Sequence, residues 1–131
     1  WTPALKGATS QSGQVYAQQI GRYSKLGRLV FVSGRIQLST LGTFTGAIQI
    51  GDLPFVADSA PLSNTGLYLA YFSGLATAVA GLSAFTSPSS LRAPIWYMAA
   101  GGGTGLTGTL QQANLTASFD VLFTGTYIAA P

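Results

Sequence analysis

Two segments of the chain alternate between apolar and polar residues, and this period of two constrains the possible fold more than any other feature. In Leu29–Leu38, one set of alternate residues is Val30, Val32, Gly34, Ile36 and Leu38, and the other is Phe31, Ser33, Arg35 and Gln37. In Leu115–Ile128, the apolar set is Leu115, Ala117, Phe119, Val121, Phe123, Gly125 and Tyr127. Because successive side chains of a strand point to opposite faces, both segments are predicted to be strands with one face on a core.

Turn signals between the apolar runs recur at short intervals, for example at Ser12-Gly13, Leu26-Gly27 and Leu41-Gly42. The runs that they separate are mostly about 8–12 residues long, which is typical of an all-β sandwich or barrel. The Ala-rich run Leu75–Phe85 is also predicted to be a strand, because its glycines and β-branched residues weaken a helix. With 131 residues, the chain has the size of one domain, so we predict a single antiparallel all-β domain over residues 1–131.

The uncharged run Leu67–Phe85 is long enough to span a bilayer as a helix. Gly74 and Gly81 interrupt it, and no Lys or Arg lies close to either end to set a topology. We therefore expect no membrane insertion.

Charged residues are scarce, and several catalytic side chains are missing altogether. Only 7% of the residues are charged and the net charge is +3, with no His, no Cys and three acidic residues, Asp52, Asp58 and Asp120. Nucleophilic systems that depend on His, disulfides and thiolate metal sites are therefore excluded, and we predict a non-enzymatic protein without cofactor or metal. A glycan hydrolase that uses Asp52 and Asp58 remains an alternative. Asp120 is expected to be a lone solvated charge on the polar face of its strand.

Two short motifs match known patterns without the context that those patterns need. Gly103–Gly108 matches the dinucleotide fingerprint G-x-G-x-x-G, but the next strand follows too soon for the helix that would bind the pyrophosphate. We expect a loop there. The glycosylation pattern at Asn114 leads directly into a strand and is expected to have no role.

Four of the six basic residues lie within Gly21–Ser39: Arg22, Lys25, Arg28 and Arg35. If Leu26-Gly27 forms a two-residue turn, Lys25 lies opposite Arg28 and Arg22 lies opposite Phe31. Arg35 would then lie about 13 Å along the strands from the position of Arg22. The cations would not form one groove, and we expect no nucleic-acid partner.

The predicted outer side of this hairpin is only partly polar, because Ile20 and Phe31 lie on it together with Arg22 and Arg35. Apolar side chains on an outer face indicate that another molecule covers it. We expect a second copy of the chain, with Ile20, Phe31, Arg22 and Arg35 as candidate subunit-interface residues.

Aromatic residues provide a candidate sugar-binding surface. Arg92, Trp96 and Tyr97 lie close together in the sequence, and Tyr71 lies in another aromatic run. Exposed aromatic rings next to polar groups are suitable platforms for the apolar face of a sugar. The alternative is that Trp96 or Tyr97 belongs to the core or to a subunit interface.

Several segments, in order, resemble the C-terminal domains of bacteriophage tail fibres and tailspikes. They are "WTPAL", "GRYSKLGRLVFVSGRIQLS", "GTFTGAIQIGDLPF" and "LTASFDVLFTGTYIAA". The similarity covers both ends of the chain and is weak between Asp58 and Thr107.

This resemblance implies a jelly-roll-like β-sandwich that forms a homotrimer at the distal end of a virion's tail fibre or tailspike. It implies a non-catalytic domain that recognises host-surface polysaccharide or lipopolysaccharide. A purely structural trimerisation or capping module, or a capsid decoration protein with a similar sandwich, are the alternatives. The family has no fixed binding residues, so the resemblance assigns no site.

Overall fold

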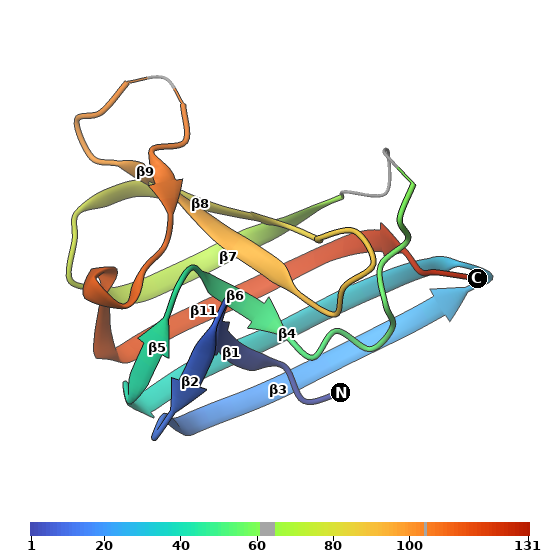
Figure 1. Cartoon of the computed structure of the whole chain (residues 1–131), viewed down its shortest axis with the longest axis horizontal. Helices are drawn as coiled ribbons and strands as arrows, with labels where there is room; N and C mark the ends of the chain where they lie inside the picture. The colour runs from blue at the N-terminus through green and yellow to red at the C-terminus, as the bar shows by residue number, and fades with distance from the viewer. Residues whose placement is uncertain (61–64, 104) are drawn as a thin grey trace.

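The computed structural model describes residues 1–60, 65–103 and 105–131, and their regular structure is almost entirely β (Figure 1). The strands are β1 (Ala4–Gly7), β2 (Ser10–Ser12), β3 (Val15–Leu26), β4 (Leu29–Thr40), β5 (Thr43–Thr45), β6 (Ile48–Gly51), β7 (Gly66–Leu75), β8 (Val79–Phe85), β9 (Ala93–Ala99), β10 (Gly108–Thr109) and β11 (Leu115–Ile128). A 3-10 turn, η1 (Gln112–Asn114), precedes β11.

One antiparallel sheet contains most of the strands, in the order β1-β6-β9-β8-β7-β11-β4-β3, with β10 paired to β9. β2 and β5 form a small separate sheet. The large sheet curls over, so that β1 and β6 cross the long strands β3 and β4 (Figure 1). Side chains of both halves join one core, for example Leu5 and Ile50 with Val30 and Ile36. The predicted antiparallel, jelly-roll-like sandwich is therefore confirmed, with its two layers joined at β7 and β8.

The predicted alternation of β4 is confirmed residue by residue. Val30, Val32, Ile36 and Leu38 are buried, whereas Phe31 and Ser33 are exposed. In β11 the alternation holds from Val121 onwards, but the pairing with β7 shifts between Leu115 and Asp120. Because of this irregularity, Ala117 is exposed instead of buried, and Phe119, Asp120 and Val121 are all buried.

Two glycines on neighbouring strands make room for two aromatic rings on the inner face. Phe123, Gly34 and Gly21 occupy directly opposed positions on β11, β4 and β3. A Cβ on Gly34 would lie 2.7 Å from Phe123 Cζ, and one on Gly21 would lie 2.7 Å from Trp1 Cε2. The Phe123 and Trp1 rings meet edge to face here, with centroids 6.1 Å apart. Trp1 Nε1 also donates to the carbonyl of Arg22 at 3.2 Å, which holds the N-terminal segment against the edge strand β3.

Two tyrosine hydroxyls connect non-adjacent segments in the same manner. Tyr127 Oη accepts a hydrogen bond from the N–H of Phe55 and donates one to the carbonyl of that residue, both at 3.0 Å. Tyr16 makes the same pair of bonds with Leu5, at 3.0 and 3.2 Å. Burial raises the pKa of the Tyr127 hydroxyl, although the bond from Phe55 partly opposes the shift.

The predicted pairing of the β3–β4 hairpin is wrong by two residues, because the turn lies one residue later than predicted. Gly27 and Arg28 form the two-residue turn, with Leu26 opposite Leu29, so Lys25 faces Val30 and Arg22 faces Ser33. Gly27 has φ of 59° and Arg28 a negative φ. This combination matches a type II′ turn, which requires glycine at the first central position rather than the second.

The uncharged run Leu67–Phe85 forms most of β7 and all of β8, with a turn between them. The strand predicted for Leu75–Phe85 is thus confirmed over Val79–Phe85. Within the described residues, no helix has the length and apolar character needed to cross a membrane.

Gly34→Ala tests the close packing at the two glycines. We expect it to lower the free energy of unfolding by about 1–3 kcal/mol, as overpacking of a core usually does, and urea denaturation measures the loss. Gly81→Ala on β8 is the matched control, because no atom lies within 4 Å of its added Cβ. Its effect should stay within about 0.5 kcal/mol. Equal losses in the two variants would contradict this account.

Candidate functional site

The side of β3, β4, β11 and β7 that is turned away from the core is called the outer face below. Strand pairing aligns side chains across it in rungs, because directly opposed residues project to the same face. One rung consists of Ile20, Arg35, Leu122 and Tyr71, and the next of Arg22, Ser33, Thr124 and Tyr68. Arg22 and Arg35 therefore occupy adjacent rungs, about 7 Å apart along the strands. The predicted separation of about 13 Å between Arg22 and Arg35 is wrong, because it depended on the wrong hairpin register. The four cations of the hairpin still do not form one groove, since Lys25 lies over Phe55 and Arg28 pairs with Asp58.

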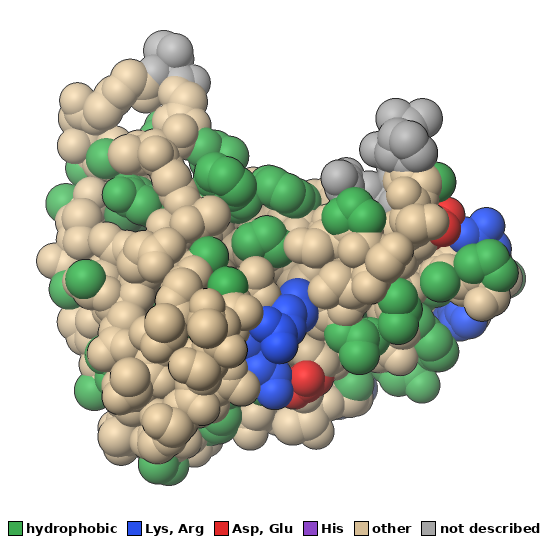
Figure 2. All heavy atoms as spheres, viewed as in Figure 1, with side chains coloured by type: hydrophobic (Ala, Val, Ile, Leu, Met, Phe, Trp, Pro, Cys, Tyr) green, Lys and Arg blue, Asp and Glu red, His purple; other side chains and the backbone are tan. Residues whose placement is uncertain are grey.

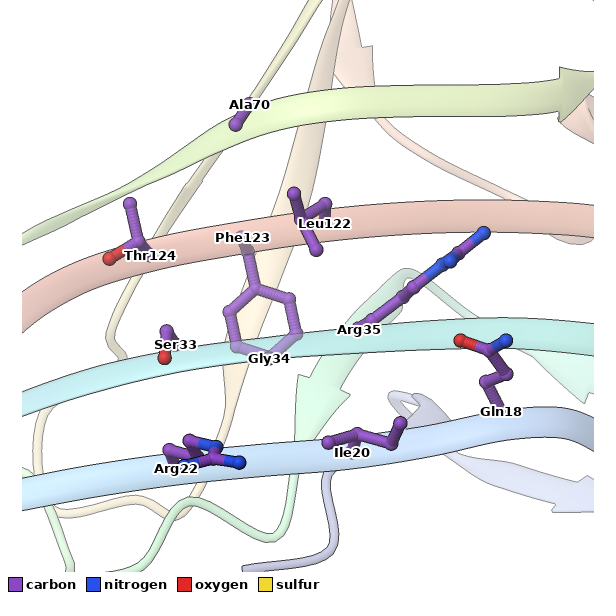
Figure 3. A pocket seen from close by; sticks show the side chains of 10 residues that line it. All are labelled: Gln18, Ile20, Arg22, Ser33, Gly34, Arg35, Ala70, Leu122, Phe123 and Thr124. Atoms are coloured by element: carbon purple, nitrogen blue, oxygen red, sulfur yellow. The ribbon is translucent and has the colours of Figure 1, made fainter.

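A hollow of about 430 Å³ opens on the outer face across these rungs. Its side chains come from neighbouring strands of the large sheet, as Figure 3 shows. They include Gln18, Ile20 and Arg22 of β3, Ser33 and Arg35 of β4, Leu122 and Thr124 of β11, and Ala70 of β7. Small residues such as Ser33 and Ala70 leave the space that longer side chains surround.

Arg35 forms one wall of the hollow and is held in place by a buried carboxylate. Its Nε donates to Asp120 Oδ1 at 3.0 Å and its Nη2 to Asp120 Oδ2 at 2.6 Å. Figure 3 shows the Arg35 side chain reaching from β4 towards β11. The hydrogen bond with Asp120 raises the pKa of Arg35, against the opposing effect of desolvation. Asp120 is only 2% exposed, so the prediction of a lone solvated charge is wrong.

The chain's three carboxylates are all engaged with cations of the same chain. Asp52 lies 3.0 Å from Lys6 Nζ, Asp58 lies 2.6 Å from Arg28 Nη2, and Asp120 pairs with Arg35. On the face drawn in Figure 2, acidic atoms lie directly against basic ones. Three of the six cations are thereby neutralised, so the net charge of +3 resides on Arg22, Lys25 and Arg92.

Among these three cations, Arg22 is the one that lines the hollow. Arg92 donates to the carbonyls of Gly7 and Ala8, at 3.3 and 3.4 Å. Lys25 Nζ lies 4.3 Å from the centroid of the Phe55 ring, on the other side of the sheet. Within residues 1–60, 65–103 and 105–131, the Arg22 guanidinium has no hydrogen bond or ion pair. It is thus a cation without a counter-charge beside an open hollow.

Asp52 and Asp58, the alternative catalytic pair, bind different cations on different elements, namely Lys6 of β1 and Arg28 of the hairpin turn. Burial raises the pKa of Asp58, but the Ser59 N–H and the Arg28 guanidinium outweigh it, so that the pKa is lowered overall. A general acid of a glycosidase needs a raised pKa. The environment of Asp58 therefore suits a partner in an ion pair rather than a general acid.

The four predicted glycan-binding residues have different environments. Trp96 stacks on Phe85, with ring centroids 5.8 Å apart, and its indole nitrogen is buried. Tyr97 points to the opposite side of β9 and packs against the core, as the alternative interpretation predicted for one of the pair. Arg92 uses its guanidinium in the carbonyl contacts given above. Tyr71 is 50% exposed on the outer face. The structure therefore does not bring the four residues into one site.

The four predicted interface residues do lie together on the outer face. Ile20 is 55% exposed and Phe31 is 47% exposed in the single chain. Ile20, Arg22 and Arg35 line the hollow, and Phe31 lies nearer the hairpin turn. Their contact with a second copy remains a prediction.

The two motif matches lie in ordinary connections. In Gly103–Gly108, Thr104 is outside the described residues, and Thr107 binds back to β9 through its N–H and the carbonyl of Tyr97 at 2.8 Å. The turn η1, and no longer helix, follows before β11. Asn114 Nδ2 donates to Thr77 Oγ1 at 3.0 Å, so the side-chain amide is used within the fold.

Gln18, Ser33 and Thr124 belong to the hollow but were not predicted as site residues. The alternation of β3 and β4 puts the first two on the outer side. A type II′ turn with glycine first would have brought Ser33 opposite Arg22. Thr124 and Ala70 come from segments that are distant in the sequence, and no local pattern indicates that they lie beside β3 and β4.

Comparisons of the chain with models of protein families, with curated proteins and with solved structures gave no match. The functional interpretation therefore depends on the chemistry and geometry of the outer face.

The Arg35–Asp120 pair yields a prediction on stability. Arg35→Met leaves a buried carboxylate without its partner, so we expect a clear fall in the urea midpoint. Asp120→Asn should also lower it, and the double variant should lose less than the sum of the two single changes. Arg28→Met, which breaks the more exposed pair with Asp58, is the control and should cost less. Strictly additive losses would contradict a coupled pair.

Proposed function

We propose that this chain is a non-enzymatic tip domain of a bacteriophage tail fibre or tailspike, which forms a homotrimer and recognises host-surface polysaccharide. The ordered motifs at both ends of the chain suggest this function, and the β-sandwich fold is compatible with it. Its place on the virion, at the distal end of the fibre, is part of the same proposal.

The observation that carries the proposal is the apolar character of the outer face. Ile20, Phe31, Leu122, Tyr68 and Tyr71 are between 43% and 70% exposed and share this one face. Large exposed apolar patches on a folded domain are typical of interaction surfaces. The chain's three carboxylates, all in ion pairs, further support binding rather than catalysis.

We place the contact between copies at the hairpin end of the outer face. Leu26, Leu29 and Ile128 are directly opposed on β3, β4 and β11, and Phe31 follows two residues along β4. Leu26 is 76% exposed. We call these four residues the apolar end. Arg28, which lies in the turn between Leu26 and Leu29, is neutralised by Asp58, and Lys25 lies over Phe55 on the other side of the sheet. A contact on the outer face at this end therefore buries apolar surface beside a compensated charge.

The alternative of a purely structural trimerisation module has one observation in its favour. Three of the predicted sugar-binding side chains, Trp96, Tyr97 and Arg92, are occupied by packing or by hydrogen bonds within the chain. Such a module would assemble through the apolar end and bind no ligand.

Light scattering after size exclusion tests the assembly. We expect the mass of three chains for the wild type and a shift to monomer for Phe31→Ser, since a buried interface aromatic contributes about 2 kcal/mol or more. Leu106→Ser is the matched control, because Leu106 is 48% exposed but lies in the connection between β9 and β10. Its mass should stay trimeric. A wild type that is monomeric at micromolar concentration would contradict the proposal.

Exchange of this domain between two phage fibres separates recognition from pure assembly. We expect the adsorption of the hybrid phage to follow the host of the transplanted domain. Adsorption that stays with the original host, in particles whose fibres are intact and trimeric, would leave only the structural role.

A further inference from the structure

We propose that the hollow on the outer face binds the anionic group of an acidic sugar residue, with Arg22 as the cation that pairs with it. The inference rests on the proposed recognition of polysaccharide and gives that recognition a site and a chemistry. The site lies on β3, β4, β11 and β7, away from the β9 residues that the sequence indicated.

The distribution of charge among the arginines supports an anion site in the hollow. Of the chain's four arginines, Arg28, Arg35 and Arg92 use their guanidinium groups within the chain, in ion pairs or in bonds to backbone carbonyls. Arg22 has no such bond in the part of the chain that the structure describes, although it lines the hollow. Because the Arg35 charge beside it is neutralised by Asp120, Arg22 carries the uncompensated positive charge of the hollow. A guanidinium can bind a carboxylate or a phosphate through two parallel hydrogen bonds.

The pairing of all acidic side chains also argues against a second copy of this chain as the occupant of the hollow. Asp52, Asp58 and Asp120 are the chain's only acidic residues, and each is already paired with a cation. A second copy would therefore cover Arg22 without supplying a carboxylate side chain, and burial of an unpaired charge is costly. An occupant that brings its own negative charge complements the hollow better than a second copy does.

The remaining lining fits a sugar. Ile20 and Leu122 offer apolar walls for the C–H face of a sugar ring, and they are 55% and 43% exposed. Gln18 and Ser33 offer an amide and a hydroxyl that have no hydrogen bond elsewhere among the described residues. Thr124 Oγ1 donates to the carbonyl of Val32 at 3.2 Å, and its oxygen can still accept a bond. Mostly apolar walls with a few polar groups are typical of small-molecule sites.

The size and support of the hollow agree with this assignment. Its volume of about 430 Å³ falls within the range of about 300–1,000 Å³ that is usual for ligand sites. The two-point bond between Arg35 and Asp120 holds one wall in place. The lining side chains belong to paired strands rather than to loops, so ligand binding costs little conformational entropy of the protein.

Calorimetry and amide NMR with the whole chain test the proposal. The probes are a glucuronate-containing oligosaccharide, the same oligosaccharide with its carboxylates reduced to alcohols, and glucose 6-phosphate. The variants are Arg22→Gln and Lys25→Gln. Both remove one positive charge from β3, but Lys25 lies on the other side of the sheet, over Phe55.

We expect the acidic oligosaccharide to bind and to shift the amide signals of Ser33 and Thr124. Arg22→Gln should weaken binding about tenfold or more, the usual loss for one charge-assisted hydrogen bond. Lys25→Gln should change it less than about threefold, the scale of a screened surface charge. The wild type should bind the reduced oligosaccharide as weakly as the Arg22→Gln variant binds the acidic oligosaccharide. Tighter binding of glucose 6-phosphate, with the same dependence on Arg22, would support the site and identify phosphate as the preferred anion.

Several outcomes would overturn the inference. Equal losses in Arg22→Gln and Lys25→Gln would show unspecific attraction to net charge. Binding of the acidic oligosaccharide that does not change in Arg22→Gln would reject the hollow but leave polysaccharide recognition intact. No binding of any saccharide would reject both. A shift of Arg22→Gln to a smaller assembly in light scattering would show that a second copy covers the hollow.

Discussion

The register of β4 against its two neighbours determines both sides of the sheet. On the inner side, it puts Gly34 between Phe123 and Gly21, so that the Phe123 and Trp1 rings can lie on the strand backbones. On the outer side, it brings Arg22 and Arg35 to adjacent rungs. Because the side chains of a strand alternate, a slip of one residue would exchange these two faces. The type II′ turn at Gly27 and the packing at Gly34 both oppose such a slip.

The small number of charges makes each ion pair informative. With three acidic residues and six basic ones, the pairing of every carboxylate leaves three identifiable cations. Arg92 and Lys25 serve the fold, through carbonyl groups and an aromatic ring. Arg22 does not, and it stands on the edge strand β3 beside the hollow. The same scarcity of carboxylates that disfavours hydrolytic chemistry also leaves this site open to an external anion.

The outer face combines two kinds of surface at different rungs. The apolar end carries Leu26 and Phe31 near the hairpin turn, where Arg28 is neutralised. The hollow lies further along the same strands and carries the uncompensated Arg22. If copies of the chain meet at the apolar end and a sugar binds in the hollow, one face of the sheet serves both assembly and recognition. In this arrangement the exposed Tyr71 is directly opposite Leu122, which lines the hollow, and can extend a sugar-binding surface.

The sequence by itself determined the all-β class, the strands Leu29–Leu38 and Leu115–Ile128, and the exposure of Ile20 and Phe31, because these follow from local alternation and turn residues. It also determined which catalytic groups are absent. The hairpin register could have been read from the preference of glycine for the first position of a type II′ turn. Only the tertiary structure decided that Asp120 is buried against Arg35, that Tyr97 packs inwards while Trp96 stacks on Phe85, and that Thr124 and Ala70 complete the hollow. The first and the last of these features depend on pairings between β4, β11 and β7, which are far apart in the sequence. The energy that selects such pairings comes from tertiary packing, which no local pattern records.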